Sequence, residues 1–291
     1  MSECQHFGLS DSSSCPLWIS KLRIILWLVG LAVVASPADS WAEAAWRDTV
    51  NTDGQHMLVV TERLVSAPFH APARGWLTAG VITAATLSTM VFDTDVRREV
   101  QSWDASWLGT VDDVGHTFQR VDLFFGTTAL IYAAGLSPNR PTVRRVGEDL
   151  VVAFAVASTG TQVVKHLAGR ARPNQNDGPR RFIGPTLDDS HQSFWSGDVT
   201  TAFTLASVLS AEIKRPVATV LLYGLATTTA VQRIHTDHHW FSDVACAAVW
   251  STAVGIGTVK LSRKLEIQTP KSDSDKGLKL ELTPVGLTAT W

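Results

Sequence analysis

Two cations near the middle of the chain are spaced so that a single helix face would present both. Lys165 and Arg172 stand seven positions apart, and Pro173 follows directly. Seven residues make two helical turns, so a helix ended by Pro173 would project both cations from one face. Paired cations at the end of an apolar segment suit an anion, phosphate above all. The alternative is a general anchor for lipid headgroups.

A second segment places small and polar residues directly before an apolar run. Ser196, Gly197 and Asp198 precede residues 199–211. A helix that begins here would offer free backbone N–H groups and its positive dipole end to an anion. The alternative is ordinary capping, because Ser196 or Asp198 would serve as the N-cap of any helix.

A third segment carries three histidines between an arginine and an aspartate. His239 and Asp243 are four positions apart, so on a helix the carboxylate would reach the imidazole. Such a bond fixes the ring tautomer and raises the basicity of the other nitrogen, which suits a nucleophile. His235, His238 and His239 would alternatively suggest a metal site, but no Cys accompanies them, and we expect no metal.

The three segments together resemble the signature of the type 2 phosphatidic acid phosphatase superfamily. That signature reads KxxxxxxRP, then PSGH, then SRxxxxxHxxxD, and this chain follows its order and internal spacing over about residues 75–260. Gln232 stands where the third element usually has Ser. The matching residues are Lys165, Arg172, Pro173, Ser196, Gly197, Arg233, His239 and Asp243.

The resemblance implies a fold and a reaction. The fold would be all-α, a six-helix bundle embedded in a membrane. The reaction would be hydrolysis of a phosphomonoester or a pyrophosphate, with no metal or other cofactor. His239 would attack phosphorus to form a phosphohistidine, and Asp243 would orient it. The phosphoryl oxygens would be held by the other polar positions of the signature, Lys165, Arg172, Ser196, Gly197 and Arg233.

One position departs from the signature in a way that affects catalysis. The second element ends in Asp198 where the family has the His that protonates the leaving oxygen. A general acid contributes about 10²–10⁴-fold. Asp198 would act as the acid at low pH, or a nearby histidine would replace it, or the leaving group would be a phosphate that needs no acid. Failing these, the chain is a phosphate-binding pseudoenzyme. The candidate histidines are His191, His235 and His238.

Composition favours a membrane protein and excludes a nucleic-acid binder. The chain has 291 residues and a net charge of −2, so it has no broad cationic surface. Charged residues make up 18% of the chain, against about 25% in soluble proteins. The 11 Trp residues also suit a water–lipid boundary.

The N-terminal residues have the pattern of an export signal. Lys21 and Arg23 precede an apolar run over residues 24–35, and small residues follow. This pattern predicts a secretory signal over residues 1–42, cleaved near Ala42. The alternative is an uncleaved anchor helix. Both interpretations send the following residues across a membrane.

Six apolar segments without charge predict the helices of the bundle. They are 13 to 18 residues long, too long for strands and too uniformly apolar for surface helices. A perpendicular span needs about 20 residues, so either polar residues complete each span or the bundle is soluble and exported. Flanking Lys and Arg favour spanning. The segments are residues 75–92, 123–137, 150–164, 199–211, 217–232 and 244–259.

The rest of the chain divides around this bundle. Many charges over residues 93–122 predict an aqueous helix and turn. Partial alternation of Leu residues predicts a short C-terminal hairpin over residues 278–291. The predicted parts are residues 1–42 as signal or anchor, 43–74 as an exported arm of one or two short helices, 75–262 as the phosphatase-like bundle and 263–291 as the tail.

The sequence predicts the partners and location in outline only. We expect a multi-pass protein of a bacterial inner membrane whose site faces the periplasm, because an export signal precedes it. The expected partner is a phosphorylated lipid; undecaprenyl pyrophosphate, phosphatidylglycerol phosphate, phosphatidic acid and the phosphates of lipid A all fit. The sequence does not determine an oligomeric state. Vanadate-dependent haloperoxidases share the signature and are a third, weaker alternative that a halide-oxidation assay would test.

Overall fold

The computed structural model describes residues 40–103, 105–137, 140–268, 279–283 and 286–290. The chain divides into two units, Met1–Asp53 and Gly54–Trp291. The predicted signal over residues 1–42 lies almost wholly outside the described residues. The predicted arm forms one long helix, α2 (Ser40–Ser66), and a short 3-10 helix, η2 (Ala67–His70), rather than one or two short helices.

All six apolar segments form helices, which confirms the all-α bundle. Each helix begins before its apolar run, but α3 and α6 end inside theirs, at Ser88 and Gly135, and a 3-10 helix, η3 (Thr89–Phe92), completes the first run. Pro141 and Pro216 begin two of the helices, where a missing N–H costs no helical hydrogen bond. The six helices are α3 (Ala73–Ser88), α6 (Val121–Gly135), α7 (Pro141–Ala168), α8 (Gly197–Ile213), α9 (Pro216–His235) and α10 (Phe241–Gln268).

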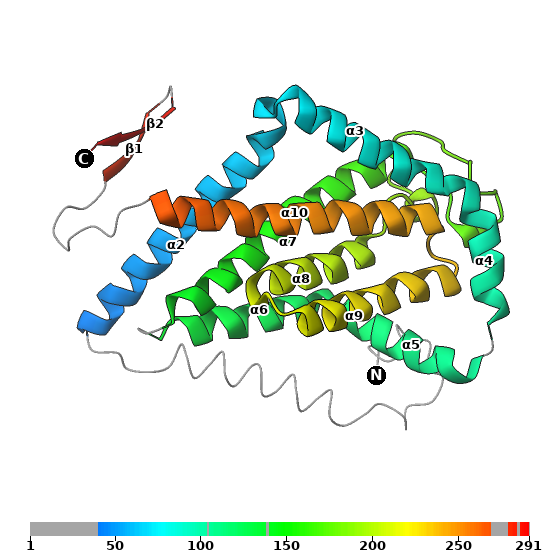
Figure 1. Ribbon diagram of the computed structural model, residues 1–291, viewed down its shortest axis with the longest axis horizontal. Coiled ribbons are helices and arrows are strands. Elements are labelled where there is room, and N and C mark those ends of the chain that lie inside the picture. The colour runs from blue at the N-terminus through cyan, green and yellow to red at the C-terminus, as the bar shows by residue number, and fades with distance from the viewer. Residues whose placement is uncertain (1–39, 104, 138–139, 269–278, 284–285, 291) are drawn as a thin grey trace. The chain divides into compact units, whose positions relative to one another are not determined.

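Helix α8 is the centre of the bundle. Ten consecutive residues, Val199 to Val208, are buried, and the helix packs against α7, α9 and α10 (Figure 1). Small and hydroxyl side chains allow this close packing. One example is the hydrogen bond of 2.9 Å between the hydroxyl groups of Thr161 on α7 and Thr200 on α8. The start of α8 is therefore held between its neighbours, where the second predicted site segment lies.

Among the residues that the structure describes, three helices are long and apolar enough to cross a membrane. They are Ala73–Ser102, which joins α3 to the following α4, then Pro141–Ala168 and Phe241–Glu266, with 30, 28 and 26 residues. The 18-residue apolar window of the first is 0% buried, and Trp76 and Leu77 are among its exposed side chains. Such a surface is typical of helices that face lipid. The chain therefore has the features of a membrane protein.

The charged segment over residues 93–122 differs from its prediction. It forms two helices, α4 (Asp93–Ser102) and α5 (Ala105–Phe118), which pack against α9. Asp93 was predicted to lie in water, yet its side chain is fully buried. The prediction was wrong at this position because a charged residue can be buried when partners from distant segments satisfy it.

The C-terminal residues form the predicted hairpin. Strands β1 (Lys279–Thr283) and β2 (Gly286–Thr290) are antiparallel, and Glu281 pairs with Thr288. Helix α10 runs on to Gln268, beyond residue 262 where the bundle was predicted to end.

Candidate active site

Lys165 and Arg172 do not share a helix face, contrary to the prediction. Helix α7 ends at Ala168, and Gly169 follows in the left-handed conformation, with φ of 58°. A Cβ at this position would also collide with the carbonyl oxygen of Gly184. Glycine therefore ends the helix before Pro173 is reached. Lys165 lies in the last turn, and Arg172 follows in the extended segment after it.

Backbone hydrogen bonds on both sides hold this extended segment. Ala171 N–H donates to Arg181 at 2.9 Å, and Arg172 N–H donates to Ser190 at 3.0 Å. The Arg172 side chain is held by Asp189: Nε donates to its carbonyl oxygen at 2.8 Å and Nη2 to its carboxylate at 2.6 Å. The Asp189 side chain is 83% exposed, so this cation faces a partner that water also reaches.

Ser196 caps helix α8, as its alternative interpretation predicted. Its buried hydroxyl accepts from the N–H of Val199 at 3.4 Å. Gly197 is the first helical residue, and a Cβ there would lie 3.9 Å from Lys165 Nζ. The ammonium group therefore lies beside the start of α8, and the positive end of a helix dipole there also attracts an anion.

A tight turn after α9 places His239. The carbonyl oxygen of Arg233 accepts from the N–H groups of His238 and His239, at 3.1 and 3.2 Å. Asp237, directly before these two histidines, is left-handed, with φ of 57°, and its carboxylate accepts two hydrogen bonds from Arg97 of α4, at 2.7 and 2.8 Å. Helix α4 thereby fixes the turn that carries the imidazole.

His239 is held in a single tautomer. Its Nδ1 lies 2.7 Å from the carbonyl oxygen of Ser193, which can only accept, so Nδ1 carries the proton and Nε2 keeps its lone pair. Burial lowers the pKa of His239 to about 4, with a smaller contribution from the Lys165 charge, while Asp243 acts in the opposite direction. The ring is therefore neutral at pH 7, as a nucleophile requires.

Asp243 contacts His239 differently from the predicted bond within a helix. His239 precedes α10, and the distance from its Nδ1 to Asp243 Oδ2 is 3.9 Å, an ion-pair distance too long for a hydrogen bond. The carboxylate accepts instead from Ser193 Oγ and from the N–H of Trp240, the latter at 2.9 Å. Ser193, whose carbonyl oxygen sets the tautomer, links the two residues.

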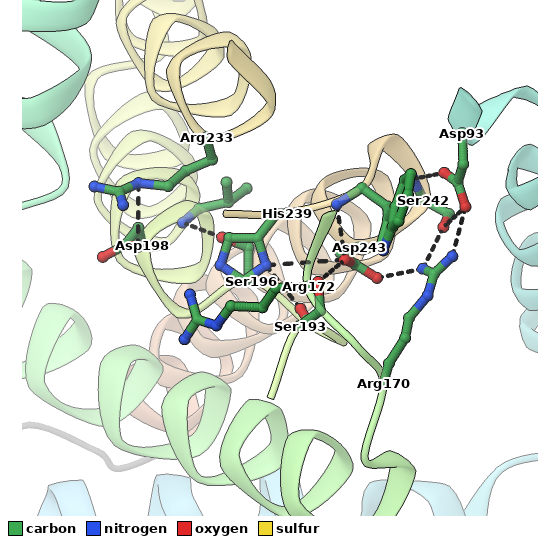
Figure 2. A network of polar contacts seen from close by, with 12 residues as sticks. Asp93, Arg170, Arg172, Ser193, Ser196, Asp198, Arg233, His239, Ser242 and Asp243 are labelled. Carbon is green, nitrogen blue, oxygen red and sulfur yellow. Dashed lines mark hydrogen bonds and ion pairs between the residues drawn. The ribbon is translucent and has the colours of Figure 1, made fainter. Parts of the chain in front are cut away.

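Asp198 is paired with one of the predicted phosphate ligands. Its Oδ2 lies 3.2 Å from Nε of Arg233, which also donates to Gln119 Oε1 at 2.7 Å. The Asp198 side chain is 39% exposed. Figure 2 shows the second ring nitrogen of His239 turned toward Arg172, Arg233 and Asp198. A phosphoryl group at this position would meet two guanidinium groups and one carboxylate.

The three histidines proposed as replacement acids lie in different surroundings. His235 Nδ1 contacts Asp112 at 3.0 Å, and His191 contacts Ser190 at 2.8 Å. The charges of Arg233, Arg172 and Asp198 all act on His238. Its pKa is lowered, mainly by burial and then by the two arginines. His238 therefore lies near the predicted site.

The sequence interpretation missed a buried ion-pair cluster behind Asp243. Arg170 contacts both Asp243 and Asp93, and all three side chains are 0% exposed. Ser242 joins them through its N–H and hydroxyl groups, at 2.8 and 2.9 Å from Asp93. Arg170 lies within the first cationic segment, but no pattern in the sequence connects it with a carboxylate 77 positions earlier.

The described residues hold no group of three or more His, Cys, Asp or Glu that could bind a metal ion. The three histidines of the third segment have separate partners: His235 contacts Asp112, His238 contacts Thr236 and His239 contacts Ser193. What the geometry supports is an anion site beside a neutral imidazole.

Comparison with family models agrees with the resemblance. Residues 148–267 match the model of the PAP2 superfamily, the type 2 phosphatidic acid phosphatases, which confirms the predicted family resemblance over that part. Two solved structures are similar. LpxE of Aquifex aeolicus has 19% sequence identity and a TM-score of 0.47, and the match covers 58% of this chain and 95% of that one. A transmembrane PAP2-type phosphatidylglycerolphosphate phosphatase of Bacillus subtilis has 14% identity and a TM-score of 0.49, and the match covers 67% of this chain and 96% of that one. No curated protein matches.

Proposed function

We propose that this chain is a membrane phosphatase that hydrolyses a lipid phosphate or pyrophosphate through a phosphohistidine. The observation that carries the proposal is the state of His239: a buried, neutral ring with Nδ1 on the Ser193 carbonyl oxygen and Nε2 toward Arg172 and Arg233. A neutral nitrogen lone pair beside fixed cations is what in-line attack on a phosphoryl group needs.

In the first step, Nε2 of His239 bonds to phosphorus as the bond to the leaving oxygen breaks. The ring becomes cationic, because Nδ1 keeps its proton, and Asp243 at 3.9 Å favours this charge. Lys165, Arg172, Arg233, Ser196 and the N–H of Gly197 would hold the phosphoryl oxygens. In the second step, water attacks phosphorus, the N–P bond breaks, and inorganic phosphate leaves while the ring returns to neutral.

The protonation of the leaving oxygen decides the substrate. An alkoxide needs a general acid, whereas a phosphate leaving from a pyrophosphate is already a weak base. Asp198 stands where the family has His, and it contacts Arg233 at 3.2 Å. We therefore propose a lipid pyrophosphate as the faster substrate, with His238 as the candidate proton donor for monoesters.

A second candidate function follows from the same ion pair. If Asp198 keeps Arg233 from substrate, the chain is a phosphate-binding pseudoenzyme of the same fold. We place the site, in either case, at the periplasmic face of a multi-pass inner-membrane protein, on the strength of the export signal predicted for residues 1–42 and of the three helices long enough to span.

The test is phosphate release by the purified, detergent-solubilised protein from lipid monophosphates and pyrophosphates. We expect the pyrophosphates to react faster, and His239→Ala to lower release by more than about 10³-fold. Asp198→His should raise monoester hydrolysis by about 10²-fold. Equal release by the wild type and His239→Ala contradicts the phosphatase. A wild type without turnover that binds phosphate, and gains turnover with Asp198→His, supports the pseudoenzyme.

A further inference from the structure

The Arg170 guanidinium is fully engaged inside the protein. Its five N–H groups all have acceptors: Nε donates to Pro179 O at 2.9 Å, Nη1 to Ser242 Oγ at 2.8 Å and to Asp243, and Nη2 to Asp93 Oδ2 and Pro179 O, each at 2.6 Å. A guanidinium with no donor left cannot bind substrate. Its function must therefore be to hold its partners inside the protein in place.

Aromatic rings fix the position of this guanidinium as well. The Arg170 Cζ atom lies 5.3 Å from the ring centre of Phe182 and 5.8 Å from those of Phe194 and Trp240. Trp240 immediately follows His239, and its indole N–H donates to Ala171 O at 2.9 Å. The packing that holds Arg170 is therefore continuous with the segment that carries the nucleophile.

The cluster holds two carboxylates on one guanidinium. Asp93 takes one edge of Arg170 and Asp243 takes the other, so the charge of Arg170 is shared. Asp243 consequently keeps part of its negative charge for the Ser193 hydroxyl, the Trp240 N–H and the nearby imidazole. Buried polar groups linked in this way polarise one another, because little solvent screens them.

We infer that Asp93 and Arg170 are positioning residues for the nucleophile, acting on His239 through Asp243 and Ser193. Figure 2 shows this line of contacts, from Asp93 through Arg170 and Asp243 to the ring. Asp93 lies at the start of α4, outside the residues 148–267 that match the family model. The chain thus completes its site with a carboxylate from the segment before that region. This inference rests on the proposed phosphatase activity.

The test compares two aspartates of the same helix. Asp93→Asn keeps the size of the side chain and an acceptor for Ser242, but removes the charge from Arg170. Asp95→Asn is the matched control, because Asp95 is exposed and contacts Arg98 at 3.3 Å on the surface. We expect Asp93→Asn to lower kcat about 10- to 100-fold with KM nearly unchanged. Asp95→Asn should leave both values at the wild-type level.

The pH profile separates positioning from loss of folded protein. With Asp93 neutral, Arg170 attracts Asp243 more strongly, and the imidazolium of the intermediate loses support. The acid limb of the kcat profile should therefore move in Asp93→Asn, and Arg170→Lys should recover more kcat than Arg170→Met. An unchanged kcat and profile in folded Asp93→Asn overturns the inference, as does a loss of kcat that follows only the fraction folded.

A double-mutant cycle tests the route through Asp243. If Asp93 acts through that carboxylate, Asp93→Asn added to Asp243→Asn lowers kcat no further than Asp243→Asn alone. If the two substitutions instead lower kcat independently, so that their effects multiply in the double variant, Asp93 does not act through Asp243. The tautomer of His239, read by NMR of ¹⁵N-histidine-labelled protein, does not need turnover. A change of the His239 tautomer away from Nδ1–H in Asp93→Asn, but not in Asp95→Asn, supports the positioning role even if the wild type proves inactive. An unchanged His239 tautomer in Asp93→Asn opposes that role.

Discussion

Two charged clusters lie at opposite ends of the same three helices, and they are built differently. The site end contains Lys165 at the end of α7, Asp198 at the start of α8 and Asp243 at the start of α10. The far end is formed by Arg145 near the start of α7, Glu212 near the end of α8 and Arg263 near the end of α10.

At the far end, arginines surround a carboxylate that is buried in the protein. Glu212 is 5% exposed and lies 3.0 Å from Arg263 and 3.6 Å from Arg145, and Arg145 also contacts Glu266. Arg263 donates in addition to the carbonyl oxygen of Ala211 at 3.0 Å. This cluster joins three helices, and its central carboxylate is shielded from solvent.

At the site end, the cations face carboxylates that solvent reaches. Arg172 contacts Asp189, which is 83% exposed, and Arg233 contacts Asp198, which is 39% exposed. An incoming phosphate can replace such partners, because their own return to water costs little. The comparison teaches that exchangeable partners, rather than the number of charges, distinguish a binding cluster from a structural one.

Among the tests of this comparison, removing a site cation should have the largest effect. Arg233→Ala should lower kcat/KM for phosphate release by about 10²–10³-fold, because a buried donor to the developing charge is lost. Arg263→Ala is the far-end control and should leave kcat/KM of the folded protein unchanged. Equal losses in both variants would remove the distinction between the two ends.

Removing the central carboxylate of the far end should act on stability instead. Glu212→Ala leaves Arg145 and Arg263 without their shared partner, and we expect a loss of about 2 kcal/mol in the free energy of unfolding, allowing for their partial exposure. Thermal denaturation in detergent measures it. Asp198→Ala, which exposes Arg233 to solvent, should change the unfolding free energy much less.

The end of α7 near the site depends on a left-handed glycine. Gly169→Ala combines a positive φ with a collision against Gly184, and should destabilise the fold by about 1–2 kcal/mol while shifting Arg170 and Arg172. Gly80→Ala, on α3 with open space around its Cβ position, is the control and should be neutral or stabilising. A wild-type melting temperature and kcat for Gly169→Ala would contradict this account.

His239 also makes the stability depend on pH. Burial lowers its pKa from an ordinary value of 6.5 to about 4. Between these values the unfolded chain takes up a proton that the folded chain refuses, so stability falls as the pH drops from 6.5 toward 4. His239→Gln should flatten this slope, measured by denaturant unfolding across that range. The same slope in both proteins would mean that the ring is not held neutral.

The sequence was sufficient for much of the fold and for a prediction of the site residues. Runs of apolar residues predict all six helices, because they are too long for strands. The spacing of His239 and Asp243 indicated their proximity, which the structure has at 3.9 Å. The predicted end of α7, at Pro173, lies beyond the observed end, because the prediction relied on the proline and did not consider Gly169 as the residue that ends the helix. The contact between His239 and Ser193 was not predicted, because a backbone carbonyl oxygen leaves no mark in residue types.

Residue types alone determined that this chain has apolar helices ended by cations, a His–Asp pair and an aspartate at the expected position of an acid. Local periodicity and spacing carry such information. Only the tertiary structure decided which carboxylate faces which cation. Asp198 on Arg233, Asp189 on Arg172 and Asp93 on Arg170 are pairs between different segments of the chain. Packing chooses them, because a buried charge must find a partner wherever the helices bring one within reach.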